Sequence, residues 1–460
     1  MVHLTGKSVY QSLLDRINAF PAGAPPSELV EKILAVLFTP DEAALVARLP
    51  IRSFRASKAA ALWGMDVAKA RDICRKLADK GLLVDVERDG KAEYTLPPPM
   101  AGFFEFALMR VRPDIDQKAL SELFYQYLNV EEDFIKDLFS FETQLGRAYV
   151  NEEALSTGPS LQVLDFDRVS FLVQEASAAA VGICYCRHKM SHVGRACTNR
   201  QDNCITLNSA ARSLIKHGIA REISKAEAME IFRDARSSRL VQFGENVREG
   251  VNFICNCCKC CCEGMIAARR FGWLHPVHAT AFQPEEVSGM CRNCGKCLSS
   301  CPVDAISRAH PPDAPQPGQG RNLHIDLDVC LGCGVCVAHC PARALQLRPR
   351  KDRILTPVNT THRVVLQAIE KGTLQNLIFD CQALASHRAM AAILGVILRL
   401  PPVKQIMASK QMKSVFLDWL LGKFPAFKAQ AGSPHPVEPH ATGGCSADGQ
   451  NQNSAPRKQS

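Results

Sequence analysis

The sequence predicts a multidomain α+β protein, and three observations lead to that class. Residues 27–99 combine several helical patterns with a final stretch of alternating polarity, which predicts helices followed by a hairpin. Residues 178–186 (AAAVGICYC) form a short apolar run after a helical segment, which predicts a buried strand. Amphipathic helical periodicity then returns between residues 359 and 421.

The chain of 460 residues is long enough for about three domains. Changes in composition and periodicity divide it further. We expect an N-terminal lead (1–26), a helix–turn–helix unit (27–99), a helical connector (100–160), a cysteine-rich domain (161–279), a cluster-binding domain (280–350), a helical C-terminal region (351–429) and a disordered tail (430–460). The tail is predicted to be disordered because it is rich in Gly, Pro, Ser, Asn and Gln.

The 21 cysteines are clustered, and the first residues lack the apolar core of a signal peptide. Both features predict a cytoplasmic protein whose thiols bind metals instead of forming disulfides. No apolar run reaches the roughly 18 residues that span a bilayer. The longest, residues 389–398, predicts a buried helix. The net charge of +9 permits an acidic partner but does not require nucleic acid.

One cysteine string occurs twice, at residues 291–302 and 330–341. Both copies have the spacing C-x-x-C-x-x-C-x-x-x-C-P, with which bacterial ferredoxins hold two [4Fe–4S] clusters. In that arrangement the last cysteine of each string binds the cluster of the other string. We therefore expect two ligand sets, which are Cys291, Cys294, Cys297 and Cys340 for one cluster and Cys330, Cys333, Cys336 and Cys301 for the other.

The region around residues 280–350 thus resembles the dicluster ferredoxin domain. Pairs of C-x-x-C also suit zinc, but two zinc sites give no reason for the repeated ending before proline. Gly295, Gly332 and Gly334 are expected where the backbone passes close to sulfide or adopts a positive φ. One departure is the Pro- and Gly-rich segment 307–322, which predicts an inserted surface loop.

Residues 27–99 resemble a winged helix–turn–helix unit, with Asp89-Gly90 as the hairpin signal of the wing. Such units either read DNA or dock proteins. Acidic residues are interleaved with the bases of the second helix, and this pattern is typical of an ordinary solvated face. We therefore expect docking or homo-oligomerisation, and not sequence-specific DNA binding. The bases concerned are Lys69, Arg71, Arg75, Lys76 and Lys80.

A second group of ten cysteines precedes the two strings. We expect one metal-binding set from Cys184, Cys186, Cys197 and Cys204, and another from Cys255, Cys257, Cys258, Cys260, Cys261 and Cys262. Three interpretations are open: further iron–sulfur clusters, a metallothionein-like zinc or copper site, or a redox-active dithiol. Their place next to the two strings favours iron–sulfur. The pairing with the strings resembles uncharacterised iron–sulfur proteins of anaerobic bacteria, which implies electron transfer.

Other residues near these thiols rank below them as ligands. His188 and His192 are spaced like a ligand pair, although a histidine is more often structural. Four bases would offset the charge of a cluster, namely Arg187, Lys189, Arg195 and Lys259. The solitary cysteines are expected to be unligated, and they are Cys74, Cys381 and Cys445.

The function expected from these features is one-electron transfer, as a carrier or as a subunit of a redox complex with a donor and an acceptor protein. Two [4Fe–4S] clusters, with additional iron–sulfur clusters or zinc, would be the cofactors. The sequence has no P-loop and no dinucleotide-binding glycine motif. Two alternatives remain open: a redox- or iron-responsive DNA-binding regulator, and an enzyme whose extra cluster is catalytic.

Overall fold

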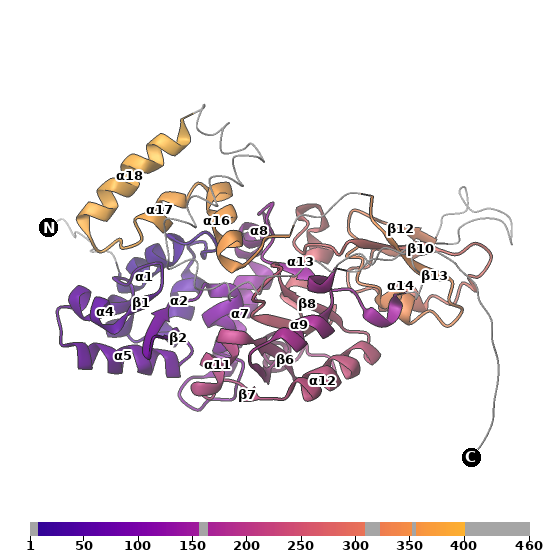
Figure 1. Ribbon diagram of the computed structural model, residues 1–460, viewed down its shortest axis with the longest axis horizontal. Helices are drawn as coiled ribbons and strands as arrows, with labels where there is room; N and C mark the ends of the chain where they lie inside the picture. Colours follow the sequence, from indigo (N-terminus) through magenta and orange to yellow (C-terminus); the bar gives the residue numbers. More distant parts are fainter. Residues whose placement is uncertain (1–7, 156–163, 309–322, 352–355, 401–460) are drawn as a thin grey trace, which may run out of the picture.

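The computed structural model describes residues 8–155, 164–308, 323–351 and 356–400. Helices and sheets are mixed along the chain, as the predicted α+β class requires. Figure 1 shows the N-terminal helices at one end, a large sheet in the middle and the strands that flank the cysteine strings at the other end.

The N-terminal unit begins with three helices, α1 (Val9–Asn18), α2 (Glu28–Leu37) and α3 (Pro40–Val46). Both α2 and α3 have side-chain caps at their N-termini. Ser27 accepts hydrogen bonds at the start of α2, and Thr39 forms a capping box with Glu42 at the start of α3. Helix α1 buries its leucines in the same core as α2 and α3, so the N-terminal lead is part of this unit.

Two further helices, α4 (Ala56–Trp63) and α5 (Val67–Asp79), precede the hairpin of β2 (Val84–Arg88) and β3 (Lys91–Thr95). Strand β1 (Phe54–Arg55) pairs with β3, which gives a three-stranded sheet in the order β1-β3-β2. The predicted turn at Asp89-Gly90 is confirmed, since both residues have positive φ. The winged-helix assignment itself stays a prediction.

The connector contains α6 (Phe104–Phe106), α7 (Gln117–Tyr125) and α8 (Asp133–Phe139), and it ends in strand β4 (Gly146–Ala148). It is therefore not purely helical, because β4 joins the central sheet. Asp116 caps α7, since its carboxylate accepts from two backbone N–H groups of the first turn. The nearby carboxylate of Asp114 accepts a hydrogen bond from the guanidinium of Arg112.

The central sheet is antiparallel, with the strand order β4-β8-β9-β6-β5-β7. Its remaining strands are β5 (Ala179–Ile183), β6 (Asp202–Leu207), β7 (Arg221–Glu222), β8 (Val241–Glu245) and β9 (Phe253–Cys257). The helices of this region are α9 (Val169–Glu175), α10 (Tyr185–His192), α11 (Asn208–Lys216), α12 (Lys225–Ser237) and α13 (Glu263–Arg270). Helices α9 and α12 share an apolar core with strands β5, β6 and β9.

Two small antiparallel sheets surround the cysteine strings. Strand β10 (Phe282–Glu286) pairs with β13 (Leu345–Pro349), and β11 (Ile306–Arg308) pairs with β12 (Leu323–Ile325). Each string contributes a short helix, α14 (Lys296–Ser300) or α15 (Val335–Ala338), and the two helices contact each other. Most of the predicted inserted loop lies outside the described residues.

The C-terminal helices are α16 (Thr360–Lys371), α17 (Leu374–Ile378) and α18 (Ala385–Arg399). The predicted burial of residues 389–398 is wrong. Ile393 and Val396 are 55% and 64% exposed, because α18 packs on α17 through the small residues Ala391 and Gly395. No helix in the described ranges is long and apolar enough to cross a membrane. The tail at 430–460 and Cys445 lie outside the described residues.

A buried polar cluster joins the hairpin of the N-terminal unit to the end of α11. The carboxylate of Asp85 accepts hydrogen bonds from Ser213 (2.9 Å), Lys216 (2.5 Å) and the His217 ring (3.0 Å). Although burial raises the pKa of Asp85, these three donors outweigh it and hold that pKa well below its ordinary value. Burial likewise lowers the pKa of His217, but Asp85 and Asp79 raise it overall.

We expect Asp85→Asn to lower the free energy of unfolding by about 2–4 kcal/mol at about pH 6, because it breaks a buried ion pair. The His217 contribution is complete below its ordinary pKa and is lost as the pH rises through its raised value. The effect of the substitution should therefore shrink at alkaline pH. Urea denaturation at about pH 6 and at alkaline pH measures the change in the free energy of unfolding.

The matched control is Asp72→Asn, which removes an exposed pair with Arg75 and should change the stability by less than about 0.5 kcal/mol. Equal losses for the two variants, or a loss at Asp85 that grows with pH, would contradict this account of the cluster.

Candidate metal centres

The first cysteine string surrounds a cavity together with the end of the second. Cys291, Cys294 and Cys297 line this cavity, and Cys340 from the other string lines it too. Cys294 is exposed, whereas Cys297 is buried. The four thiols that the spacing assigns to one cluster therefore face one common space.

The second group is buried more deeply. Cys330, Cys333 and Cys336 are all buried, and so is Cys301 from the first string. Burial raises the pKa of Cys336, and the neighbouring Cys333, Cys330 and Cys301 raise it further. Uncharged thiols would be favoured at this place unless a cation binds them, so the position suits metal ligation.

Backbone groups position these sulfur atoms in the same way in both strings. The N–H group of Ala305 donates to Cys301 Sγ, and that of Ala344 donates to Cys340 Sγ, both over 3.2 Å. The predicted positive φ angles of Gly295, Gly332 and Gly334 are confirmed, at 72°, 65° and 77°. Thiolates with N–H donors and close glycine backbone suit an iron–sulfur cluster.

The other ten cysteines form two groups that differ from the predicted ones. The structure groups them differently from the expected sets at 184–204 and 255–262, because the run 255–262 is divided between two places. Cys258, Cys260 and Cys261 meet Cys197 at one place. A second cavity of about 60 Å³ is lined by the other six and also by Cys258, so the two groups adjoin at Cys258. The other six are Cys184, Cys186, Cys204, Cys255, Cys257 and Cys262.

The six-thiol chamber, as we call this second group, is built by three adjacent strands. Cys184 directly follows β5, Cys204 lies on β6, and Cys255 and Cys257 lie two residues apart on β9 and so on one face. The register pairs Ile205 with Ile254, which brings Cys204 opposite Cys255 with a sulfur–sulfur distance of 3.7 Å. Hydrogen bonds from Cys204 and Cys257 lower the pKa of Cys255.

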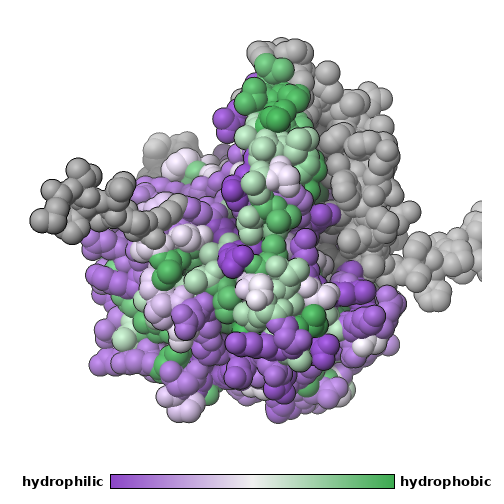
Figure 2. Space-filling model, turned by 90° about the vertical axis from the view of Figure 1, so that its left-hand side faces the viewer, coloured by the Kyte–Doolittle hydropathy of each residue, from purple (hydrophilic) through white to green (hydrophobic). Residues whose placement is uncertain are grey.

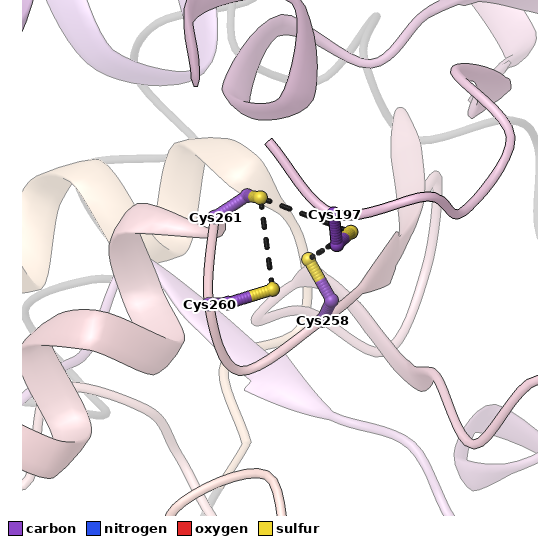
Figure 3. A group of neighbouring side chains, drawn as sticks. All are labelled: Cys197, Cys258, Cys260 and Cys261. Carbon is purple, nitrogen blue, oxygen red and sulfur yellow. Dashed lines mark hydrogen bonds between the residues drawn. The ribbon is translucent and has the colours of Figure 1, made fainter. Parts of the chain in front are cut away.

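The tetrathiolate, our name for Cys197, Cys258, Cys260 and Cys261, is a much tighter group. Its four sulfur atoms all lie within 4.8 Å of one another, and Figure 3 shows them directed toward one point. The sulfur–sulfur distances are 3.6 Å from Cys197 to Cys258, 3.8 Å from Cys197 to Cys261, and 3.7 Å from Cys260 to Cys261. Asn199 donates its side-chain N–H to Cys197 at 3.3 Å.

Arg187 is the base that lies between the two groups. Burial disfavours its charge, but the thiolates of Cys184, Cys258 and Cys257 raise its pKa overall. Its guanidinium is 1% exposed and donates to the carbonyl oxygen of Asn256 at 2.7 Å. This fixed positive charge would offset the negative charge of metal-bound thiolates.

The three other predicted bases have different partners. Lys189 binds Glu263 in a buried pair, and Lys259 binds Asp304 at 3.0 Å. The guanidinium of Arg195 lies over the ring of Tyr125, 4.9 Å from its centroid. Each of these three bases therefore has a partner other than the thiols whose charge it was expected to offset.

The histidine pair is also engaged elsewhere. His188 binds the carbonyl oxygen of Leu108 through Nδ1 at 2.7 Å, and its Nε2 meets His192 Nε2 at 3.2 Å. The tetrathiolate contains only thiols. Glu105, which the sequence did not single out, also lines the six-thiol chamber. Glu105 belongs to the short helix α6 and is far from these cysteines in sequence, so only the tertiary structure brings it to the chamber.

A comparison with known protein families identifies the domain that contains the two cysteine strings. A family model described as a 4Fe-4S dicluster domain matches residues 290–344. The chain therefore contains an iron–sulfur, ferredoxin-like domain. No curated protein and no solved structure matches the chain. The predicted resemblances of the winged helix and of the ten further cysteines have no counterpart in these comparisons and stay predictions.

The close approach of the second string to β10 makes Gly332 a sensitive position. A Cβ atom there would lie 1.9 Å from the Phe282 carbonyl oxygen and 2.4 Å from Thr280 Oγ1. On the predicted ligand sets, Gly332→Ala should therefore displace the loop that holds Cys330 and Cys333. We expect the iron content to fall from about eight to about four atoms per chain, measured on anaerobically purified protein.

Gly289→Ala is the control, because Gly289 has a similar φ of 75° but no atom within 4 Å of the added Cβ. It should retain its iron. Full iron content in Gly332→Ala, or the same loss in both variants, would show that the contact with Phe282 does not shape the site.

Proposed function

We propose that the protein transfers single electrons between redox partners through two [4Fe–4S] clusters and at least one further metal centre. Cys291, Cys294, Cys297 and Cys340 would hold one cluster, and Cys330, Cys333, Cys336 and Cys301 the other. The observation that carries the proposal is the cavity shared by the first three cysteines of one string and the last of the other. When bound, each cluster would take up and release one electron.

Packing between the two cysteine regions supports a relay of several centres. Cys257 and Cys262 of the six-thiol chamber belong to the same apolar core as Cys301 and Cys333. A continuous core keeps water out and fixes the separation of the centres. Electrons could then pass between the regions without a large movement of the protein.

Exposure differs between the two predicted clusters, and this difference assigns them different roles. Cys294 is exposed, whereas Cys330, Cys333 and Cys336 are buried. Electron exchange with a partner would therefore occur at the Cys294 end. Arg292 and Lys296 are exposed beside it, so this end would attract an acidic redox protein.

The proposal is tested by metal and sulfide analysis of the full chain, purified without oxygen. We expect at least about eight iron atoms and about eight acid-labile sulfides, with absorbance that bleaches on reduction. Protein that contains zinc alone and cannot be reduced would refute it.

A matched pair of variants tests the exchange of the last cysteines. Cys301→Ala should perturb the cluster of Cys330, Cys333 and Cys336, and Cys340→Ala should perturb the cluster of the first string. Electron paramagnetic resonance of the reduced variants distinguishes the two clusters. Damage confined to the cluster of the same string in each variant would overturn the assignment.

A further inference from the structure

The spacing of sulfur atoms in the tetrathiolate fits one metal ion and not a cubane. Four ligands at about 2.3 Å from one tetrahedral ion are about 3.8 Å from one another. The three sulfur–sulfur distances of 3.6, 3.7 and 3.8 Å agree with this value. In a cubane each thiolate binds a different iron, which separates the ligand sulfur atoms to roughly 6 Å. All six pairs here lie within 4.8 Å.

The donor set also limits which metal fits. Four thiolates form the closed tetrahedral shell that is typical of structural zinc sites. Fe²⁺ binds a given site more weakly than Zn²⁺, and soft Cu(I) does not need four ligands. Hard cations such as Mg²⁺ and Ca²⁺ require oxygen.

We infer that Cys197, Cys258, Cys260 and Cys261 bind a single zinc ion, separate from whatever the six-thiol chamber holds. The inference rests on the proposed function only for the presence of metal centres in this protein. Because zinc has no redox chemistry, this ion would be a structural centre beside those that carry electrons. On binding, four zinc–sulfur bonds form, the four thiols release four protons to solvent, and no electron is transferred. The site then carries two negative charges, beside the buried positive charge of Arg187.

The position of the site indicates a structural role. It ties the loop of Cys197 to the turn 258–261, which are about 60 residues apart in the chain. Lys259 in this turn binds Asp304, three residues after Cys301, and Arg269 binds the same carboxylate at 2.7 Å. Zinc would therefore fix the turn that holds the cysteine-rich region against the dicluster domain.

The test uses the full chain, purified without oxygen, with zinc and iron counted and the zinc X-ray absorption spectrum recorded. We expect about one zinc per chain with four sulfur ligands at about 2.3 Å. Cys260→Ala should lower zinc at least about tenfold after dialysis against a chelator while iron and sulfide stay constant. Cys260 is exposed, so this change should not disturb the core.

Cys204→Ala, in the six-thiol chamber, is the matched control and should retain the zinc. Wild-type protein without zinc, a zinc spectrum with oxygen or nitrogen ligands, or loss of iron in Cys260→Ala would overturn the inference. The proposed function fails separately, if zinc is present as expected but the cysteine strings hold no reducible iron.

A second, independent observation is the apolar face of α18. Met390, Ile393, Val396 and Ile397 are 44–64% exposed, and they recur at helical spacing on one side of the helix. Figure 2 shows this helix as a hydrophobic ridge on an otherwise largely hydrophilic face. An exposed face of this kind marks an interaction site.

The charge of the same part of the chain indicates which surface covers this face. Helix α18 contains two bases, Arg388 and Arg399, and no acidic residue, and the sequence from 401 to 430 adds five lysines and one acidic residue, Asp418. An apolar helix face in a basic segment is typical of helices that lie on anionic bilayers. We propose that α18 attaches the protein peripherally to a membrane surface with anionic phospholipids.

Flotation of the full chain with vesicles tests this attachment. Wild-type protein should float with vesicles that contain phosphatidylglycerol and not with pure phosphatidylcholine vesicles. Val396→Glu should lower the bound fraction at least about tenfold, because it removes an apolar contact and adds a negative charge. Val111→Glu makes the same change at a 75%-exposed valine elsewhere and should bind like wild type.

Several results would overturn the proposal. These are no binding of wild type, equal binding to both vesicle types, or binding that Val396→Glu leaves unchanged. A dimer that forms without lipid and dissociates in Val396→Glu would instead assign the apolar face to a second copy of the chain.

Discussion

The close packing of thiols inside the protein is the constraint on which the rest of the structure depends. Two thiolates about 4 Å apart repel each other by about 4 kcal/mol at the effective dielectric constant of a protein. Ten such groups in two adjacent clusters need cations between them or protons on them. Arg187 lies among them as one buried base, and it cannot neutralise both clusters. Metal binding would resolve this conflict, because one cation can serve several thiolates at once.

The central sheet places the thiols with little freedom. Asn256, between Cys255 and Cys257, is buried, and its side chain is held by hydrogen bonds to Gln242 and Asn203. That polar anchor fixes the side on which the two cysteines lie, because a shift by one residue would exchange the faces of β9. The remaining thiols of the chamber come from several elements: Cys184 directly follows β5, Cys204 lies on β6, Cys186 lies in α10, and Cys262 precedes α13.

Contacts between the cysteine-rich region and the dicluster domain hold the two sets of thiols together. Asp304 follows Cys301 closely and binds two bases of the cysteine-rich region, Lys259 and Arg269. The backbone N–H group of Asn151, just after β4, donates to the carbonyl oxygen of Cys333 at 2.8 Å. The dicluster domain is thus held from two sides, and this rigidity suits centres that exchange electrons over a fixed distance.

The sequence alone determined the local chemistry of this protein. Spacing within one short loop decides whether three thiols reach one cluster, so the strings at 291–302 and 330–341 predicted the dicluster domain that the family comparison supports. Capping residues such as Ser27 and Thr39, and the turn at Asp89-Gly90, were predictable for the same reason, since each acts over a few residues.

Only the tertiary structure decided how distant residues combine. The folded structure divides the run 255–262 between two groups of thiols. It also places Cys197 beside Cys258, which is 61 residues away in the chain. The packing of helices decided two further features: Glu105 lies at the chamber, and the apolar residues of α18 are exposed. Hydrophobicity and spacing along one segment carry no information about which other segment lies opposite, and that choice depends on packing between segments far apart in sequence.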